Sequence, residues 1–305
     1  MKSTFQVLKQ AAIDFIDDKV LRMSAALAYY TVFSLPAMLL VIIWVSDLFL
    51  GREAIEGSLF NQISDFVGAE AAKQIEGAIR ASRESQSGGI AAVIGIGTLL
   101  VTATTVFGEI QDSINYIWRL KAKPKRGFLK MLLNRLISFS MLVGLGFLLL
   151  VTLMVHSLLS LLLDRITALL PDLSSYLVYI INLSISFLVT SLLFGIIFKV
   201  LPDAKVKWRH VRAGAFTTAI LFMVGEFLIG LYLGSNQASS VYGAAGSLIL
   251  ILLWVYYSSM ILYFGAEFTR VYAMHKGERI YPNEYAVWIQ QVEIESEKAL
   301  QDQPE

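Results

Sequence analysis

The chain has 305 residues, of which 56% are apolar and 16% are charged, and its mean hydropathy is +0.63. Soluble domains have about 45–50% apolar and about 25% charged residues, so the composition favours a lipid bilayer as the environment and excludes an ordinary globular core. The formal net charge of +1 provides no overall basic field for nucleic acid. Because the chain has no cysteine, disulfides, thiolate metal sites and cysteine nucleophiles are excluded.

The first segment of the chain predicts an interfacial helix on the cytoplasmic leaflet. Its apolar residues share one helical face: Phe5, Leu8, Ala12, Phe15 and Ile16. The first long apolar stretch begins near Ala25 and is too long for the apolar part of a signal peptide, so we expect a retained membrane anchor.

Six apolar stretches are long enough to cross a hydrocarbon core of about 30 Å as helices. They cover Ala26–Leu50, Gly89–Phe107, Leu136–Leu163, Tyr176–Leu201, Ala213–Leu233 and Ala244–Phe268. These stretches are continuously apolar, whereas the strands of a membrane barrel alternate over about ten residues. The sequence therefore predicts an all-α, polytopic bundle of six transmembrane helices.

The lysines and arginines predict the orientation of this bundle. They gather before the first span, in the second connection (Arg119 to Arg135) and in the fourth (Lys205 to Arg212). The third connection has only Arg165 and the fifth has none, while the first, Gly51–Gly88, has four but is richer in acidic residues. Since basic loops stay inside, we expect a multi-pass protein of the inner (plasma) membrane with both termini in the cytoplasm.

Two regions outside the spans have patterns of their own. In the outer loop, residues 52–87, apolar residues recur every four positions, which predicts an amphipathic helical hairpin divided near Gly68. It lies on the outer face of the bundle or forms a lid over a cavity. We place a membrane domain at 1–275 and a cytoplasmic polar, acidic tail at 276–305, with a short helix before a disordered end.

Glu226 is the clearest ionisable residue inside a predicted span, and such residues tend to face the bundle interior. It shares a small, polar helical face with Gly214, Thr218 and Gly225, which predicts packing against other helices. Glu226 is either a structural, hydrogen-bonded glutamate or a group that binds protons or substrate. His156 is placed in the same outer half of the membrane and is either a packed neutral side chain or the partner of Glu226 in a proton relay.

A second polar group marks the predicted cytoplasmic end of the second span. Glu109, Asp112, Asn115 and Arg119 follow at spacings of three and four residues and so share a face. Tyr116 and Trp118 lie among them, where aromatic residues gather at a membrane interface. Arg135, Glu267 and Arg270 are expected close by. The group is either an anchoring ion network or an inner gate or headgroup site.

The turn between the fifth and sixth predicted spans, Gly230–Leu248, is rich in glycine and uncharged polar residues, including Asn236 and Tyr242. Such backbone at membrane depth is tolerated when it is buried in protein or lines a cavity. It is either a tight loop or a re-entrant segment along a substrate path. The Gly230–Gly234 spacing suits helix contact within one chain or between copies in a homo-oligomer.

Motifs for several kinds of chemistry are missing from the sequence. There is no glycine-rich phosphate loop after a strand, no paired-histidine metal motif and no Gly-x-Ser-x-Gly elbow. We therefore expect no catalytic residues, no cofactor and no metal. Membrane lipids are the expected partners, since the basic loops attract anionic headgroups, and nucleic acid is not.

Several segments, taken in order, resemble the YihY/BrkB family of inner-membrane proteins. They are "MSAALAYYTVFSLPAMLLV" at Met23–Val41, "GEIQDSINYIW" at Gly108–Trp118, "VLPDAKVKWRHVRAGA" at Val200–Ala215 and "SSVYGAAGSLILILLWVYYSSMILYFGAEF" at Ser239–Phe268. The resemblance runs from about Phe15 to Tyr272. It implies six transmembrane helices and a role in envelope lipid or lipopolysaccharide handling. Members have also been labelled ribonuclease BN, and this sequence has no nuclease domain to support that label.

The sequence thus predicts transport or translocation of a lipid or another small envelope-related substrate. The alternative is a non-transporting scaffold for envelope assembly. The substrate, the direction of movement and the oligomeric state do not follow from the sequence.

Overall fold

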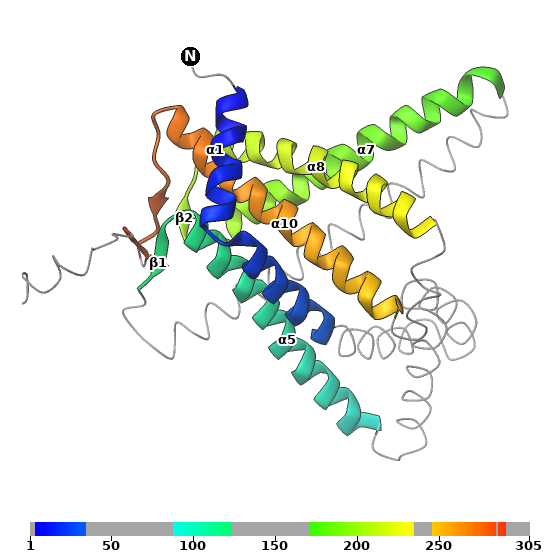
Figure 1. Ribbon diagram of the computed structural model, residues 1–305. Helices are drawn as coiled ribbons and strands as arrows, with labels where there is room; N and C mark the ends of the chain where they lie inside the picture. The colour runs from blue at the N-terminus through cyan, green and yellow to red at the C-terminus, as the bar shows by residue number, and fades with distance from the viewer. Residues whose placement is uncertain (1–3, 35–87, 124–170, 235–245, 285, 291–305) are drawn as a thin grey trace, which may run out of the picture.

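The computed structural model is mostly helical and describes residues 4–34, 88–123, 171–234, 246–284 and 286–290 (Figure 1). A helix over residues 20–34 follows the first labelled helix. The labelled helices are α1 (Thr4–Asp17), α5 (Gly88–Ile117), α7 (Pro171–Val200), α8 (Trp208–Gly234) and α10 (Gly246–His275). The strands are β1 (Leu120–Ala122), β2 (Ala204–Lys205), β3 (Tyr281–Pro282) and β4 (Ala286–Trp288).

Three described helices are long and apolar enough to cross a membrane: Tyr179–Val200, Trp208–Leu228 and Ile251–His275. They correspond to the fourth, fifth and sixth predicted spans. α5 contains the second predicted span and extends well beyond it. The third predicted span, most of the first and the hairpin at 52–87 lie outside the described residues.

Local chemistry explains where α7 begins and where α10 ends. α7 begins at Pro171, whose fixed φ and missing N–H suit the first helical position. α10 ends at His275, and Gly277 follows with a φ of 73°. The Glu278 N–H then donates to the Ala273 carbonyl at 3.0 Å, which satisfies a carbonyl at the helix end.

The strands collect at one end of the bundle, which we call the strand end. Figure 1 shows the C-terminal ends of α5 and α10 and the start of α8 meeting there. β1 pairs antiparallel with β4, with Lys121 opposite Val287, and β2 pairs with β3, with Lys205 opposite Tyr281. Backbone pairing with β2 and β1 holds residues 281–282 and 286–288 extended. The predicted short helix and disordered end of the tail stay predictions, because residues 291–305 lie outside the described residues.

The hydrophobic core of the described residues lies toward the strand end. It joins Ile117 and Trp118 to Phe198 of α7 and Tyr263 of α10, and Val20 and Leu27 enter it from residues 20–34. Trp118 is 2% exposed, and its indole N–H donates to the Ala266 carbonyl at 2.9 Å. This hydrogen bond satisfies the polar atom of Trp118 inside the core, and the expectation that Trp118 lies at the depth of a membrane interface stays a prediction.

α8 and α10 approach closely through a reciprocal pair of Gly-x-x-x-Thr segments. A Cβ added at Gly214 would overlap the Thr269 hydroxyl, and one added at Gly265 would overlap the Thr218 hydroxyl. Each threonine donates to the carbonyl of the glycine four residues before it, at 2.7 Å. Small residues that let helix backbones approach are the usual means of association in membranes, so this contact fixes the relative position of α8 and α10.

Gly265→Ala should lower the free energy of unfolding by about 1–3 kcal/mol, because the new methyl group has no space. Gly108→Ala is the matched control, since a Cβ there meets nothing within 4 Å and alanine favours a helix by about 1 kcal/mol. The measurement is the thermal unfolding midpoint in detergent. Equal midpoints for the two variants would contradict the close packing of α8 and α10.

Candidate functional site

One face of α1 carries both apolar and acidic residues onto α10. Val7, Ala11, Asp14 and Asp18 follow at spacings of four, three and four residues, which places them on one side of the helix. Val7 and Ala11 are buried against Phe268 and Val271 of α10. The apolar face expected from the sequence points elsewhere, since Phe5 and Ile16 are 73% and 71% exposed.

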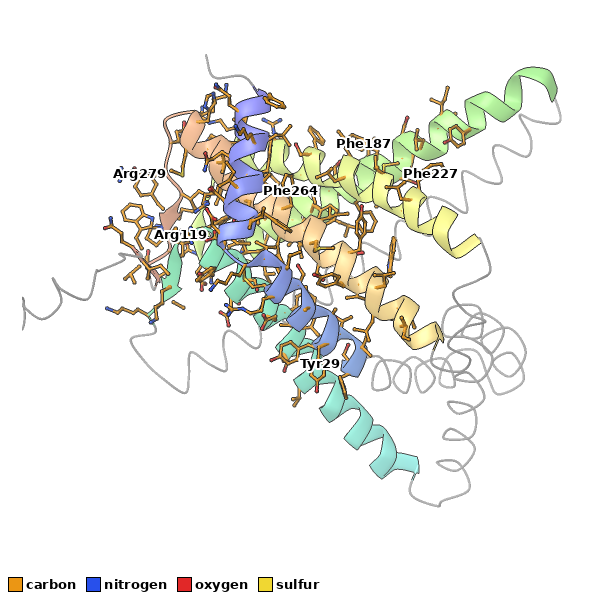
Figure 2. The ribbon with its side chains drawn as sticks, in the orientation of Figure 1. Tyr29, Arg119, Phe187, Phe227, Phe264 and Arg279 are labelled. Carbon is orange, nitrogen blue, oxygen red and sulfur yellow. The ribbon has the colours of Figure 1, made fainter. Side chains whose placement is uncertain are left out.

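The two aspartates enter a set of charged groups that we call the ion network: Asp14, Asp18, Arg119, Glu267 and Arg270. Arg270 Nη2 lies 2.6 Å from Asp14 Oδ2 and 2.9 Å from Glu267 Oε2. Asp18 Oδ1 lies 2.7 Å from Arg119 Nη1, and its Oδ2 lies 3.9 Å from Arg270 Nη2. The network thus joins α1 and the residue after it, Arg119 beyond the end of α5, and the C-terminal part of α10. Figure 2 labels Arg119 at the strand end.

The ion network is buried at Asp18, Glu267 and Arg270, while the side chains of Asp14 and Arg119 keep exposed fractions of 19% and 30%. Glu267 is fully buried and Asp18 is 2% exposed. Removing one member of a buried charge pair leaves the other charged group without compensation, at a cost of several kcal/mol. Within the described part of the chain, three carboxyl groups meet two guanidinium groups, so the charges of the network balance when one carboxyl group holds a proton.

Arg119 also has an unusual backbone. Its φ is 60°, a left-handed conformation that costs a non-glycine residue about 1–2 kcal/mol. Its carbonyl accepts a hydrogen bond from the Ile289 N–H at 2.9 Å, and its side chain pairs with Asp18. Tertiary contacts therefore hold the turn that directs the chain from α5 into β1.

A second polar cluster lies beside the ion network and centres on Asp203, in the turn between α7 and β2. Asn115 Nδ2 donates to Asp203 Oδ2 at 3.0 Å, and the Asp203 N–H donates to Asn115 Oδ1 at 2.9 Å. Gln111 donates to the other carboxylate oxygen at 3.2 Å, and the Asn283 N–H donates to the Asp203 carbonyl at 3.0 Å. Asp203 thus connects α5, the turn after α7 and the segment after β3.

Two more carboxyl groups predicted for the site lie on α5 just before this cluster, beyond the predicted second span. Burial raises the pKa of Glu109, and the Asp112 carboxylate raises it further. Partial desolvation and the Asp203 carboxylate raise the pKa of Asp112, although this residue is exposed. This end of α5 therefore faces several acidic groups.

Besides Glu109 and Asp112 on α5, the predicted site residues fall into four sets. Arg119 and Glu267 meet in the ion network through Asp18 and Arg270, while Asn115 belongs to the Asp203 cluster. Glu226 is exposed on α8. His156, Arg135, Asn236 and Tyr242 lie outside the described residues.

The predicted packing of Glu226 against other helices is not seen. Gly214, Thr218 and Gly225 of the same predicted face are buried, and a Cβ at Gly225 would overlap the Tyr257 ring of α10. One residue advances an α-helix by about 100°. With Gly225 directed at α10, Glu226 is turned away from that contact.

Sequence reasoning missed Asp14, Asp18 and Asp203. The signal for Asp14 and Asp18 was their spacing of three and four residues from Val7 and Ala11, which places all four on one helical face. Another face of the same helix, with Phe5, Leu8 and Ile16, is more apolar and is therefore the predicted packed face. Asp203 follows Pro202 in a basic connection and has the sequence pattern of a turn residue.

Comparison with known proteins agrees with the sequence resemblance. The family model described as virulence factor BrkB matches residues 12–286. The chain belongs to this family. The match includes α1 from Ala12 onward, every described helix after it, and the strands as far as Ala286.

Several similar curated proteins have the name UPF0761 membrane protein. One from Stenotrophomonas maltophilia is 29% identical over 269 residues, which cover 83% of this chain and 57% of the relative. One from Pseudomonas aeruginosa is 31% identical over 260 residues, covering 83% and 59%. One from Azotobacter vinelandii is 29% identical over 260 residues, covering 83% and 60%. The chain thus spans less than two thirds of these relatives, and no solved structure matches it.

Asp18→Ala should lower the free energy of unfolding by about 3–5 kcal/mol, because Arg119 keeps its charge and loses the carboxylate beside it. Asp17→Ala is the control: Asp17 is exposed and adjacent, so a change within about 0.5 kcal/mol is expected. The measurement is thermal unfolding in detergent at one pH and salt concentration. A similar loss in both variants would show that the ion network adds nothing to stability.

Asn115→Asp should make stability more sensitive to pH. The new carboxyl faces Asp203, so the pKa of the pair rises in the folded state above the roughly 3.9 of an unfolded aspartate. The folded state then holds a proton more tightly than the unfolded state, and stability present at low pH is lost as pH rises through the raised pKa. The unfolding midpoint of the variant should fall further below that of the natural chain between about pH 5 and pH 8. A difference in unfolding midpoint that stays constant from about pH 5 to pH 8 would show that the side chains at positions 115 and 203 do not face each other.

Proposed function

We propose that this membrane protein moves a lipid or another small envelope-related substrate across or within the inner membrane, and that it is not an enzyme. The observation that carries the proposal is the buried ion network at the strand end. Buried ionisable groups in membrane helices typically mark ion, proton or substrate pathways. Similarity to membrane proteins of the same family supports a location in a membrane but does not identify a substrate.

In this proposal the ion network is the inner gate. It connects three segments that are far apart along the chain: α1, Arg119 in the turn after α5, and α10. The basic connections predict that the strand end is cytoplasmic. Opening would separate α1 from α10 and break the Asp14–Arg270 contact, while the Gly-x-x-x-Thr contact keeps α8 and α10 together.

Energy would come from a gradient, because the sequence has no glycine-rich phosphate loop following a strand. The ion network has three carboxyl groups and two guanidinium groups, a composition that supports protons as the coupling ion. Uptake of a proton would balance the buried charge when the gate is closed. This places the proton-binding role on the network rather than on Glu226, which is exposed.

Proteoliposomes containing fluorescent phospholipids test the proposal. The natural chain should speed exchange of lipid between leaflets relative to protein-free vesicles, and a pH gradient should change the rate. Asp14→Asn should raise the rate without a gradient by about two- to fivefold, as expected for loss of one ion pair. Asp17→Asn, on the exposed side of α1, should not. No movement of anionic or zwitterionic lipid, with or without a gradient, would count against the proposal.

A non-transporting envelope scaffold is the second candidate, and the tight packing of α8 on α10 favours it. The overlap predicted for a Cβ at Gly214, Gly225 or Gly265 leaves no space between these helices. A scaffold needs a rigid bundle and no gate. The two candidates differ in the Asp14→Asn variant, which changes lipid movement only in a transporter.

A further inference from the structure

Three donors at the start of α8 surround the carboxylate of Glu278. Lys207 Nζ lies 3.1 Å from Glu278 Oε2, and His210 Nε2 lies 2.9 Å from the same oxygen. Arg209 pairs with the other oxygen, Oε1. Glu278 reaches this position because the left-handed Gly277 ends α10 directly before it. One carboxylate therefore occupies a site with an arginine, a lysine and an imidazole.

The surroundings of this site are strongly basic. Residues 199–212 and 276–290 contain seven Lys or Arg residues but only three acidic ones: Asp203, Glu278 and Glu284. Asp203 is buried and holds Asn115, so it does not balance the surface charge. Lys207 and Arg209 remain 66% and 55% exposed while they contact Glu278. An incoming anion can therefore reach them.

An apolar track leads away from the site along α8. Arg212, Phe216, Ile220 and Val224 follow at intervals of four residues, and all four are exposed. Three exposed aromatic residues, Trp208, Tyr281 and Trp288, lie around the basic end. Figure 2 shows Phe227 far along α8 from the strand end, where Arg279 lies. Aromatic residues and a basic end above an apolar helix face match the headgroup and acyl regions of one leaflet.

We propose that Lys207 and Arg209, beside the buried His210, bind the headgroup phosphate of an anionic phospholipid, and that Glu278 occupies this site when no lipid is bound. An arginine fork and a lysine recognise phosphate and carboxylate oxygens alike. The acyl chains lie along Phe216 and Ile220. The site does not depend on transport, because a scaffold would bind the same lipid.

Native mass spectrometry of the purified full chain, with phosphatidylglycerol or phosphatidylcholine added to the delipidated protein, tests the site. The natural chain should bind phosphatidylglycerol more tightly. Arg209→Gln should weaken that binding about tenfold through loss of a charge-assisted contact. Lys205→Gln is the matched control: it removes the same charge from the exposed strand residue two positions before Lys207, and it should change binding less than about twofold.

Glu278→Gln tests the opposite effect on lipid binding, because it removes the competing carboxylate and leaves the cations in place. It should strengthen phosphatidylglycerol binding by about threefold or more. Lys207→Gln should also weaken phosphatidylglycerol binding, and it replaces Arg209→Gln if that variant gives less folded protein, because Lys207 is more exposed. Elution at the natural position in size-exclusion chromatography verifies the fold of each variant.

Two results would overturn the proposal. One is equal weakening by Arg209→Gln and Lys205→Gln, which would indicate attraction by the overall basic surface. The other is displacement of phosphatidylglycerol by inorganic phosphate at equal concentration, which would indicate a site for free phosphate without a role for the α8 track.

Discussion

The burial of Asp18 is the constraint on which the strand end depends. A buried carboxylate must be compensated by charge or hydrogen bonds, and Arg119 and Arg270, which are far apart in the sequence, provide that compensation. To meet this requirement, α1 must lie on α10 and the end of α5 must reach both. The apolar contacts of Val7 and Ala11 with Phe268 and Val271 act in the same direction. The charged and the apolar contacts of α1 therefore stabilise the same position of this helix on α10.

The backbone shows the same constraint. Lys19 and Arg119 have left-handed φ values of 55° and 60°, and they are the non-glycine residues with positive φ in the described parts of the chain. One follows Asp18 and the other is its partner. Both turns bring a charged side chain into the ion network, so the local strain is offset by contacts made there. The pairing of β1 with β4 and the hydrogen bonds of Asp203 then close the same end.

The membrane helices could be predicted from sequence because each is a continuous apolar run of sufficient length, as in Tyr179–Val200. The strands could not, since β2 and β3 have two residues each and exist only through pairing across the fold. Likewise, Arg119 and Glu267 could be proposed as neighbours from their places at span ends. Asp18 could not, because an aspartate on a short amphipathic helix has the pattern of a solvated residue, and only the docking of α1 buries it.

Glu226 shows the limit of face arguments within a single helix. Glycine and threonine residues on α8 indicated correctly which side packs, since Gly214, Thr218 and Gly225 are buried. The rotation of the helix is set more finely, by the fit of Gly214 against Thr269 and of Gly225 against Tyr257. That fit turns Glu226 away from α10, whereas Asp18 and Glu267 are buried in the ion network at the strand end.

Docking of α1 on α10 is the central claim, and thiol labelling tests it most directly because the chain has no cysteine. Ala11→Cys places a thiol at a fully buried position, and Ala12→Cys places one at the adjacent exposed position. In native membranes, a water-soluble maleimide should label Cys at position 12 readily and at position 11 slowly. Adding Arg270→Gln to the Ala11→Cys chain should speed labelling. Equal labelling at both positions in the otherwise natural chain would show that α1 is not held on α10, and the account of the ion network would then be wrong.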